Sequence, residues 1–334
     1  MRPLRVGLVS SVGGHLAELM ELQPVLAGCD LFWVLNDAAP WQTGTSLGAR
    51  RTYRIVHAER DVRQLWNLVE ALPILAGERP DVLISTGASP AVPFFGLGRL
   101  LGACTLFIET FAAVDQPSLT GRLIQRLALA EHLFVQWPEL LRTLPRAQYC
   151  GPIFVPHEPL KRPPDALRLL VTVGTSPRPF NRLLTWLDRL EADGALPHPL
   201  LVQTQAPAAH LRRLATVPYL TATELDRHIA TAERIVCHGG AGVLGSCLKF
   251  GRHAIVVPRR AAHGEHVNDH QLMLCQALAA RGLITLCESE PELAAALKSP
   301  APVAPALSPL PTGLLPAVAE LLRAAARARG RSYG

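Results

Sequence analysis

The segment VCHGGAGVLGSC, residues 236–247, sets a Cys-His pair against glycines at the end of an apolar run. Residue types of this kind fit a Cys-His nucleophile, a metal site, or a loop whose backbone contacts a phosphate. The nucleophile needs the side chains of Cys237 and His238 close together, whereas adjacent strand residues point to opposite faces. The spacing therefore favours the phosphate loop.

The glycines of this segment lie where an expected strand, RIVCHGG, passes into an expected helix, AGVLGSCLKFG. At such a turn the missing Cβ atoms allow backbone N–H groups at a helix N-terminus to approach a phosphate. We therefore predict that His238, Gly239, Gly240 and Gly242 form a phosphate-binding loop. The alternative is an ordinary tight turn, which any α/β protein can build with glycine.

A polar cluster follows in HAIVVPRRAAHGEHVNDHQ, residues 253–271. His266 and His270 are spaced i, i+4 and could share a metal on one helix face, but the glutamate of the metalloprotease pattern is missing after His266. The alternative is that Glu265, Asn268 and Gln271 hydrogen-bond ribose and sugar hydroxyls. We expect no bound metal and no cofactor here, and a solvated helix start is the plainest alternative.

Further candidates follow other apolar runs. Gly174, Thr175 and Ser176 end LRLLVTVGTS and are expected to help a helix N-terminus face a phosphate, or to act as ordinary N-caps. Two residues are candidates for a general base: His15, after SSVGG, and Glu109, after TLFI. The alternative for Glu109 is a structural hydrogen-bond acceptor at the end of a strand.

The elements that must position these residues form two series. Apolar runs alternate with amphipathic stretches twice along the 334 residues, which predicts two Rossmann-like doubly wound parallel-sheet domains that face each other across a cleft. We expect a domain at 1–150, a linker at 151–166, a second domain at 167–298, and a Pro-rich connector with a terminal helix at 299–334.

Composition excludes several classes of protein. The longest apolar stretch is broken by Pro90, Pro93 and Arg99, so no transmembrane segment is expected, and the start reads as a strand rather than a signal peptide. Seven cysteines without a CxxC pair fit a reducing cytoplasm. The net charge of +6 suits nucleic acid, anionic lipid or phosphorylated small molecules, but no basic run is interleaved with aromatics as nucleic-acid binding would favour.

Two segments suit a membrane surface. AVPFFGLGRLLGA and GRLIQRLALAEH combine aliphatic residues with Arg99, Arg122 and Arg126, as interfacial helices do. The alternative is that both helices pack their apolar faces on the sheet.

The second half, with VTVGTSPRPFNRLL and CHGGAGVLGSCLKFGRHAIVVPRRAAHGEHVNDHQ, resembles the C-terminal domain of glycosyltransferase family 28, the catalytic subunit of two-component UDP-GlcNAc and exopolysaccharide transferases. The first half, with SSVGGHLAELMEL, STGASPAVPF and FIETFAAVDQPSLTGRLIQRLALAEHLFVQWPEL, is similar to the membrane-associated acceptor subunit of the same enzymes. The resemblance covers about residues 5–290 and implies a fused GT-B enzyme.

That resemblance implies metal-independent, inverting transfer from a UDP-sugar (UDP-GlcNAc, UDP-glucuronate or UDP-hexose) to a polyprenyl-diphosphate-linked saccharide at the cytoplasmic face of the membrane. An anionic membrane surface would be a partner and nucleic acid would not. On the acceptor side it implies Gly13, Gly14, Ser118 and Arg122.

The chain departs from the family pattern at two positions. Ser246 stands where the donor family commonly has a glutamate that holds the ribose, and Ala113 stands where the bacterial partner subunit usually has an arginine. Two alternatives therefore stay open: a nucleotide-sugar 2-epimerase of the same fold, and a catalytically impaired binding subunit.

Overall fold

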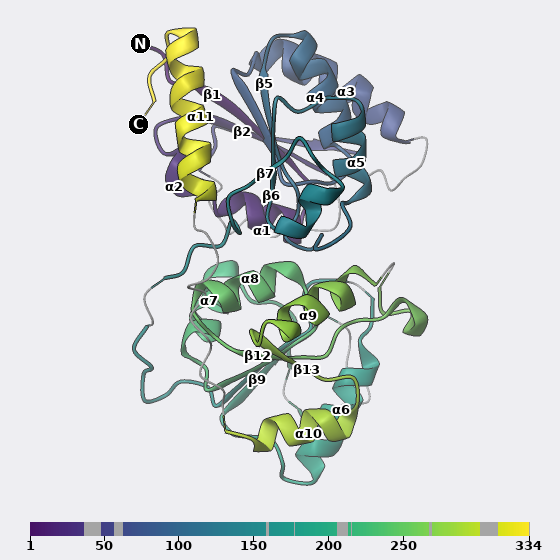
Figure 1. The fold of residues 1–334 in the computed structure, drawn as a ribbon. Coiled ribbons are helices and arrows are strands. Elements are labelled where there is room, and N and C mark those ends of the chain that lie inside the picture. Colours follow the sequence, from purple (N-terminus) through teal and green to yellow (C-terminus); the bar gives the residue numbers. More distant parts are fainter. Residues whose placement is uncertain are drawn as a thin grey trace. The chain divides into compact units, whose positions relative to one another are not determined.

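The computed structural model describes residues 1–36, 48–56, 63–157, 160–176, 178–205, 213–214, 216–266, 269–300 and 313–333. The chain divides into two compact units: unit 1 is Met1–Ile153 with Leu310–Gly334, and unit 2 is Phe154–Pro309. The division between the units thus falls inside the segment 151–166, and the terminal helix belongs to unit 1 (Figure 1). Most of the predicted connector, 301–312, lies outside the described residues.

Unit 1 is built on a seven-stranded parallel sheet in the order β3-β2-β1-β4-β5-β6-β7. The strands are β1 (Arg5–Ser10), β2 (Asp30–Asn36), β3 (Arg51–Ile55), β4 (Val82–Ser85), β5 (Cys104–Ile108), β6 (His132–Val135) and β7 (Gln148–Tyr149). The helices are α1 (Gly14–Met20), α2 (Gln23–Leu26), α3 (Arg63–Glu78), α4 (Ala91–Leu100), α5 (Leu119–Arg126), the 3-10 helix η1 (Pro138–Arg142) and α11 (Leu314–Arg329). Strand order reverses between β1 and β4, where doubly wound sheets bind ligands.

Unit 2 repeats this order in a six-stranded parallel sheet, β10-β9-β8-β11-β12-β13. Its strands are β8 (Leu169–Thr172), β9 (Leu200–Gln203), β10 (Thr216–Val217), β11 (Arg234–Cys237), β12 (Ala254–Val256) and β13 (Ile284–Leu286). Its helices are α6 (Asn181–Ala192), α7 (Ala222–Thr231), α8 (Ala241–Lys249), the 3-10 helix η2 (Ala261–His263), α9 (His270–Ala280) and α10 (Glu290–Lys298). The reversal point lies between β8 and β11, so both units are Rossmann-like, as predicted.

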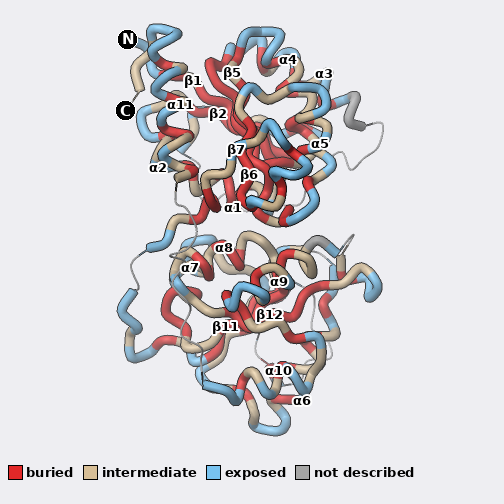
Figure 2. The backbone as a smooth tube through the Cα atoms, viewed as in Figure 1, coloured by how far each residue is buried: buried red, intermediate tan, exposed pale blue. Residues whose placement is uncertain are grey.

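The central strands are buried because helices cover both faces of each sheet, whereas the edge strands β3, β7 and β10 are partly exposed (Figure 2). In unit 1, α3, α4 and α5 lie on one face and α2 and α11 on the other (Figure 1). In unit 2 the apolar stripes of α6 and α10 pack on inward side chains of β8, β9, β11 and β12. Each Å² of apolar surface that is removed from water stabilises the fold by about 25 cal/mol, so this packing is the main contribution to the stability of the units.

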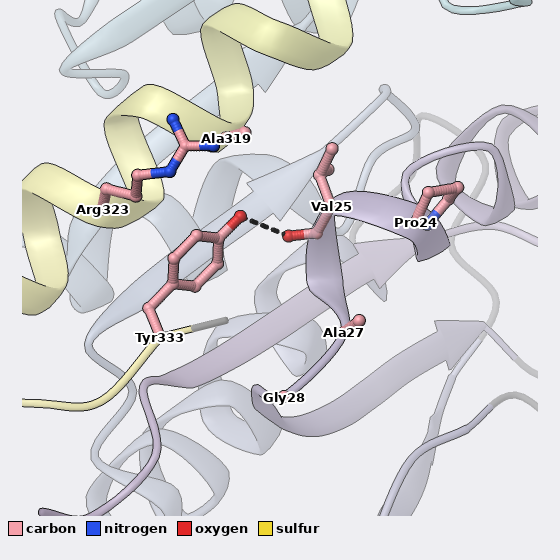
Figure 3. A pocket seen from close by; sticks show the side chains of 7 residues that line it. All are labelled: Pro24, Val25, Ala27, Gly28, Ala319, Arg323 and Tyr333. Atoms are coloured by element: carbon pink, nitrogen blue, oxygen red, sulfur yellow. Dashed lines mark hydrogen bonds between the residues drawn. The ribbon is translucent and has the colours of Figure 1, made fainter.

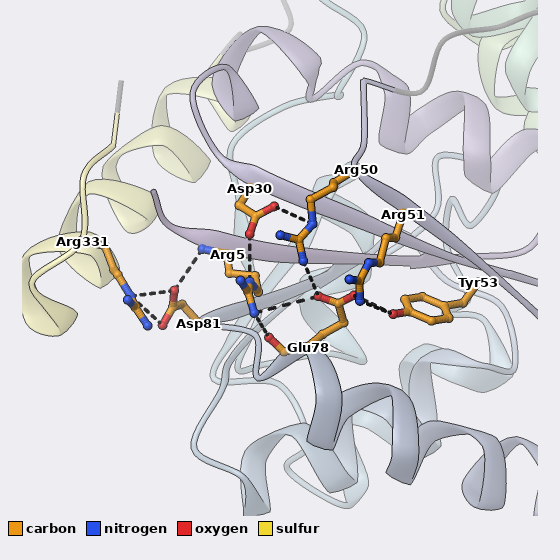
Figure 4. Close-up of polar contacts among 8 residues, drawn as sticks. All are labelled: Arg5, Asp30, Arg50, Arg51, Tyr53, Glu78, Asp81 and Arg331. Carbon is orange, nitrogen blue, oxygen red and sulfur yellow. Dashed lines mark hydrogen bonds and ion pairs between the residues drawn. The ribbon is translucent and has the colours of Figure 1, made fainter. Parts of the chain in front are cut away.

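The amino-terminal edge of the unit 1 sheet is held by a charged cluster rather than by apolar contacts (Figure 4). Arg5 Nε donates to Asp30 at 2.9 Å, and the buried Glu78 accepts from Tyr53 Oη at 2.6 Å. Asp81, which is also buried, pairs with Arg331 from the segment after α11 at 3.2 Å. This cluster ties the tail to the sheet at the edge opposite the loops that follow the strands.

Candidate active site

His15 bridges the two loops at the reversal point of the unit 1 sheet. Its Nδ1 lies 3.1 Å from the carbonyl oxygen of Thr86, and the Thr86 hydroxyl donates to the carbonyl of His15 at 2.7 Å. A carbonyl can only accept, so the contact assigns the proton of the neutral ring to Nδ1 and leaves a lone pair on Nε2. Burial lowers the pKa of His15, partly offset by the Thr86 hydrogen bond, and so favours this neutral, basic form.

Glu109 lies at the carboxyl end of β5, but it points into the protein. It is fully buried, and its Oε1 accepts from the N–H of Thr110 at 3.0 Å while Oε2 accepts from the N–H of Ser118 at 3.2 Å. Ser118 is the N-cap of α5 and accepts from the N–H of Gly121 at 3.0 Å. A Cβ on Gly121 would collide with the Glu109 carboxylate, so glycine is required there. Glu109 therefore anchors the start of α5.

A second buried carboxylate, Glu18 of α1, was not predicted from the sequence. Its Oε1 accepts from the Thr110 hydroxyl at 2.7 Å, and its Oε2 accepts from the N–H of Phe111 at 3.0 Å and from Gln136 Nε2 at 2.7 Å. Gln136 also donates to the carbonyl of Glu109 at 3.1 Å. Glu18 and Gln136 thereby join α1 to the loops after β5 and β6.

Burial raises the pKa of both carboxyls. The pKa of Glu18 rises to about 8, mainly by desolvation and with a smaller contribution from the charge of Glu109. The pKa of Glu109 rises to about 7, again by desolvation, against the hydrogen bonds from Ser118 and Thr110. Burial thus favours the protonated form of Glu18 at neutral pH and brings the titration of Glu109 close to neutral pH.

The predicted acceptor-side residues lie around this edge. Gly13, with φ of +100°, and Gly14 are exposed in the turn before His15, and a Cβ on either would meet nothing within 4 Å. Arg122 is exposed on α5 and donates to Gln116 at 3.3 Å. Ala113 is buried in the loop after β5, so no charged group replaces the family arginine at that position.

His238 holds the corresponding place at the reversal point of unit 2. Its Nδ1 lies 3.4 Å from the carbonyl of Thr172. A Cβ on Gly174, whose φ is +76°, would lie 2.5 Å from the imidazole, and a Cβ on Gly240 would also collide with it. Burial, with help from the charge of Arg259, lowers the pKa of His238 to about 3. His238 is thus a neutral ring enclosed by two glycine turns.

The N-terminus of α8 is open. Gly240 is its N-cap, and no side chain caps the helix. Its first-turn N–H groups and the positive end of its dipole suit an anion, and Gly242 lies in that turn. Gly239, with φ of +81°, lies beneath it, where a Cβ would come within 2.6 Å of Cys275 Sγ.

The loop after Gly174 differs from the expectation. The helix there begins only at Asn181, with Phe180 as its N-cap, so Thr175 and Ser176 are loop residues and not N-caps. Pro177 and Pro179 each lack a backbone N–H, which delays the helix. Thr175 is exposed, and the Ser176 hydroxyl accepts from the N–H of Arg178 at 3.3 Å.

Glu265 is buried and already bound within unit 2. Arg182 holds both carboxylate oxygens, with Nε to Oε1 at 3.0 Å and Nη2 to Oε2 at 2.9 Å, and the N–H of Arg260 donates to Oε2 at 3.0 Å. Gln271 Oε1 is buried without a hydrogen-bond partner among the described residues. Asn268 lies outside the described residues.

Ser246 of α8 is hydrogen-bonded to a carboxylate on the neighbouring helix α7. Its hydroxyl donates to Asp226 Oδ1 of α7 at 2.7 Å, and Lys249 Nζ lies 3.5 Å from Asp226 Oδ2. The sequence does not predict this contact because the two residues are 20 positions apart on different helices. A carboxylate therefore does lie beside the position where the family pattern has one.

The nucleophile alternative receives no support at the donor loops, and the metal alternative stays a prediction because the side chain of His270 lies outside the described residues. Burial raises the pKa of Cys237 to about 12, so the reactive thiolate is disfavoured. Within the described ranges, the metal-ligating side chains that lie close enough to share an ion are Cys104, Glu131 and His132, at the amino-terminal ends of β5 and β6.

The exposed apolar surface of unit 1 lies partly in the two segments expected from the sequence and partly on α3. Phe94 and Phe95 of α4 are fully buried against the sheet, but Leu100, Leu101 and Leu127 are 83%, 53% and 55% exposed. Trp66, Val69 and Leu72, spaced three apart on α3, are 61%, 61% and 52% exposed and form a further apolar stripe. Within the part of the chain that the structure describes, no helix has both the length and the apolar character to cross a membrane.

A pocket of about 490 Å³ lies between α2 and the tail (Figure 3). Arg323 and Tyr333 line it, and Tyr333 Oη donates to the carbonyl of Val25 at 2.7 Å. None of the predicted site residues borders this pocket, so it is separate from the loops described above.

Two family descriptions match the chain. "Oligosaccharide biosynthesis protein Alg14 like" covers residues 55–153, and "Glycosyltransferase family 28 C-terminal domain" covers residues 168–305. The rat UDP-N-acetylglucosamine transferase subunit ALG14 is 25% identical over 183 residues, which cover 44% of this chain and 81% of the relative. A Xanthomonas euvesicatoria UDP-N-acetylglucosamine–N-acetylmuramyl-(pentapeptide) pyrophosphoryl-undecaprenol N-acetylglucosamine transferase is 26% identical over 328 residues, covering 89% of this chain and 72% of the relative.

Solved structures show the same fold. Acinetobacter baumannii MurG has a TM-score of 0.62 at 18% identity and covers 96% of this chain and 100% of its own. UDP-GlcNAc 2-epimerase from Methanocaldococcus jannaschii has a TM-score of 0.59 at 11% identity, covering 96% of this chain and 100% of its own, so fold alone does not separate the two activities. The family matches do separate them: the chain is a glycosyltransferase of GT-B fold that joins an Alg14-like region and a glycosyltransferase family 28 C-terminal domain in one polypeptide.

Proposed function

We propose that the enzyme transfers a sugar from a UDP-sugar, with inversion and without a metal, to a saccharide carried on a polyprenyl diphosphate. The observation that carries this proposal is the open N-terminus of α8, which follows a glycine turn and offers backbone N–H groups to a diphosphate. The names of both relatives, which are UDP-N-acetylglucosamine transferases, support the donor class, and the pyrophosphoryl-undecaprenol in the name of the Xanthomonas relative supports the acceptor class.

On the acceptor side His15 is the general base. Its Nε2 keeps a lone pair in the neutral ring, because Nδ1 is turned to the carbonyl of Thr86. Glu109 is the weaker candidate since it is fully buried and both its oxygens accept backbone hydrogen bonds. Its role is to position α5 and the loop before it.

On the donor side the loop Gly174–Ser176 and the first turn of α8 receive the diphosphate, and Gln271 offers a buried carbonyl oxygen to the nucleotide or sugar. The ribose hydroxyls bind the carboxylate of Asp226, which Ser246 orients. Glu265 is committed to Arg182 and supports the loop instead.

The acceptor lipid places the enzyme at the cytoplasmic membrane surface. The exposed stripe of Trp66, Val69 and Leu72 provides apolar area for this contact, and the exposed Arg122 and Arg126 add attraction to anionic lipid.

The test is an incubation of the full chain with UDP-GlcNAc, UDP-glucuronate or UDP-glucose and a polyprenyl-diphosphate-linked saccharide, with and without EDTA, read by mass spectrometry and by the anomeric configuration of the product. Glycosylated lipid in both conditions is the expected result. An epimerised free nucleotide sugar would assign the 2-epimerase chemistry instead, and binding of UDP without turnover of any donor would assign a binding subunit.

A further inference from the structure

Arg259, three residues after the end of β12, is a buried cation beneath the donor loops. It is 1% exposed, and three backbone carbonyls accept its hydrogen bonds: Arg178 and Glu265 from Nη1 at 2.8 and 3.1 Å, and Val173 from Nη2 at 2.9 Å. The guanidinium also lies 4.8 Å from the ring centroid of Phe180. It thereby joins both ends of the loop that contains Gly174–Ser176.

No carboxylate forms a hydrogen bond with this charge within the described residues. The charge of Glu265 acts on Arg259, but Glu265 gives both oxygens to Arg182, and the neighbouring Arg260 pairs with Glu288. Arg259 Nε is itself buried without a partner among the described residues. The cluster of Arg182, Arg259 and Glu265 beneath the loops therefore holds two cations and one carboxylate, which leaves one net positive charge.

Such a charge is costly in a folded protein, since desolvation of a cation is offset only by paired charges or by strong hydrogen bonds. An anion bound above the loop would supply the missing balance. The N–H groups of Thr175 and Ser176, which lie on the loop between the two carbonyls that Arg259 holds, have no acceptor among the described residues.

We propose that Arg259 is a positioning residue for the diphosphate of the donor: it holds Val173 and Arg178 on either side of Gly174–Ser176, and its charge is balanced by the bound diphosphate. This inference rests on the proposed function for the identity of the donor, but the anion it requires is tested independently of it. The same arrangement would stabilise the negative charge on the leaving diphosphate. The positive charge of Arg259 acts on the diphosphate through the loop backbone that lies between them, without direct contact.

The experiment measures binding of UDP, uridine and inorganic pyrophosphate to the full chain by calorimetry. Arg259→Met removes the charge and keeps most of the side-chain volume, whereas Arg259→Lys keeps the charge but cannot bridge two carbonyls. The matched control is Arg252→Met, because the half-buried guanidinium of Arg252 also donates to backbone carbonyls, those of Ala232 and Glu233, at the opposite edge of the same sheet.

For Arg259→Met we expect UDP and pyrophosphate to bind about 10- to 100-fold more weakly while uridine affinity changes less than about threefold. Arg259→Lys should fall between this variant and the wild type, and Arg252→Met should leave all three affinities unchanged. A uniform loss for UDP and uridine, or an unchanged UDP affinity, would overturn the inference and make Arg259 a fold residue.

The same measurements separate the two proposals. If the wild type binds pyrophosphate through Arg259 but binds no uridine nucleotide, the anion role stands and the UDP donor is wrong. If the wild type binds neither, both proposals fail. If Arg259→Met does not fold, Arg259→Lys provides the test. A larger loss of affinity for pyrophosphate than for uridine in that variant would support the proposal, and equal losses would overturn it.

Discussion

The imidazole of His15 fills the space that a side chain on Gly87 would need. A Cβ on Gly87 would lie 2.8 Å from His15 Cε1 and 2.9 Å from Nδ1. Because Gly87 also has φ of +130°, both the backbone of the turn and the position of the ring depend on glycine there. The position of the candidate base His15 thus depends on Gly87 in the loop after β4.

Gly87→Ala should therefore lower kcat by about tenfold or more by displacing the ring, with UDP affinity unchanged because the donor loops belong to unit 2. Steady-state kinetics and calorimetry measure the two effects. Gly96→Ala is the control. Gly96 lies inside α4, and a Cβ there would meet only Leu129, at 4.0 Å, so activity should be retained. Equal losses in both variants would mean that Gly87 acts only on stability.

The pH dependence of kcat/KM distinguishes the two base candidates. A base works above its own pKa, and burial lowers the pKa of His15 below its usual 6.5. We expect the acid limb of the profile to fall below about pH 6.5 and His15→Ala to lower the rate about 100-fold. An acid limb near pH 7, with Glu109→Gln inactive and His15→Ala active, would identify Glu109, whose pKa is raised to about 7.

Glu18→Gln should reduce the loss of stability at alkaline pH. The pKa of Glu18 rises from 4.5 in the unfolded chain to about 8 in the folded protein, so between these values the folded state holds a proton that the unfolded state lacks. Stability linked to this group is full below about pH 4.5 and is lost as pH rises through about 8. Urea unfolding at pH 5.5, 7 and 8.5 measures this.

Glutamine imitates the protonated acid and can still receive the hydrogen bonds of Phe111 and Gln136. The free energy of unfolding of Glu18→Gln should therefore fall less than that of the wild type between pH 5.5 and 8.5. Parallel pH curves would show that Glu18 is ionised in the folded protein across this range. Glu18→Ala should cost about 2 kcal/mol or more at every pH, since it leaves these buried donors unpaired.

Asp226→Asn should weaken UDP binding if its carboxylate holds the ribose hydroxyls. We expect a loss of about 1 to 3 kcal/mol for UDP and a much smaller loss for 2′,3′-dideoxy-UDP, measured by calorimetry as a double-mutant cycle. Additive losses would place Asp226 away from the ribose. Glu265→Gln serves as the comparison, because it should mainly lower stability by weakening the pair with Arg182.

The stripe on α3 should carry lipid binding. Replacing Trp66, Val69 and Leu72 together by serine should reduce sedimentation with anionic vesicles at least about tenfold, because each exposes much of its apolar area. Leu100→Ser with Leu101→Ser is the control, since these residues are 83% and 53% exposed at the end of α4. If only the α4 variant lost vesicle binding, the membrane contact would be assigned to the segment AVPFFGLGRLLGA, as the sequence predicts.

Much of the fold could be predicted because buried parallel strands are continuous apolar runs. RVGLVS and LLVT are readable in this way, whereas β3, RTYRI, is an exposed edge strand with three charged or polar positions and was missed. The amphipathic stretch at 15–28 is split into α1 and α2 before Pro24, as proline's missing N–H requires.

The site was less predictable because its contacts join distant positions. His15 and the glycine turns were found from local patterns, since each follows an apolar strand. Glu18 lies on an apolar helix where an acid is ordinarily solvated, and its partners Thr110 and Gln136 are 92 and 118 residues away. The ion pair between Glu265 and Arg182 was not predicted either, because the two residues are 83 positions apart in the sequence.

The return of the chain from unit 2 to unit 1 sets an order of events during synthesis. The tail pairs Arg331 with Asp81, and the N–H of Leu4 next to β1 donates to the carbonyl of Ser332 at 2.9 Å. These partners leave the ribosome only after all of unit 2 has been made. Unit 1 therefore cannot complete its contacts until the last residues of the chain are made, and a chain that ends after residue 300 would contain every described helix and strand of unit 2 but lack α11 and the tail of unit 1.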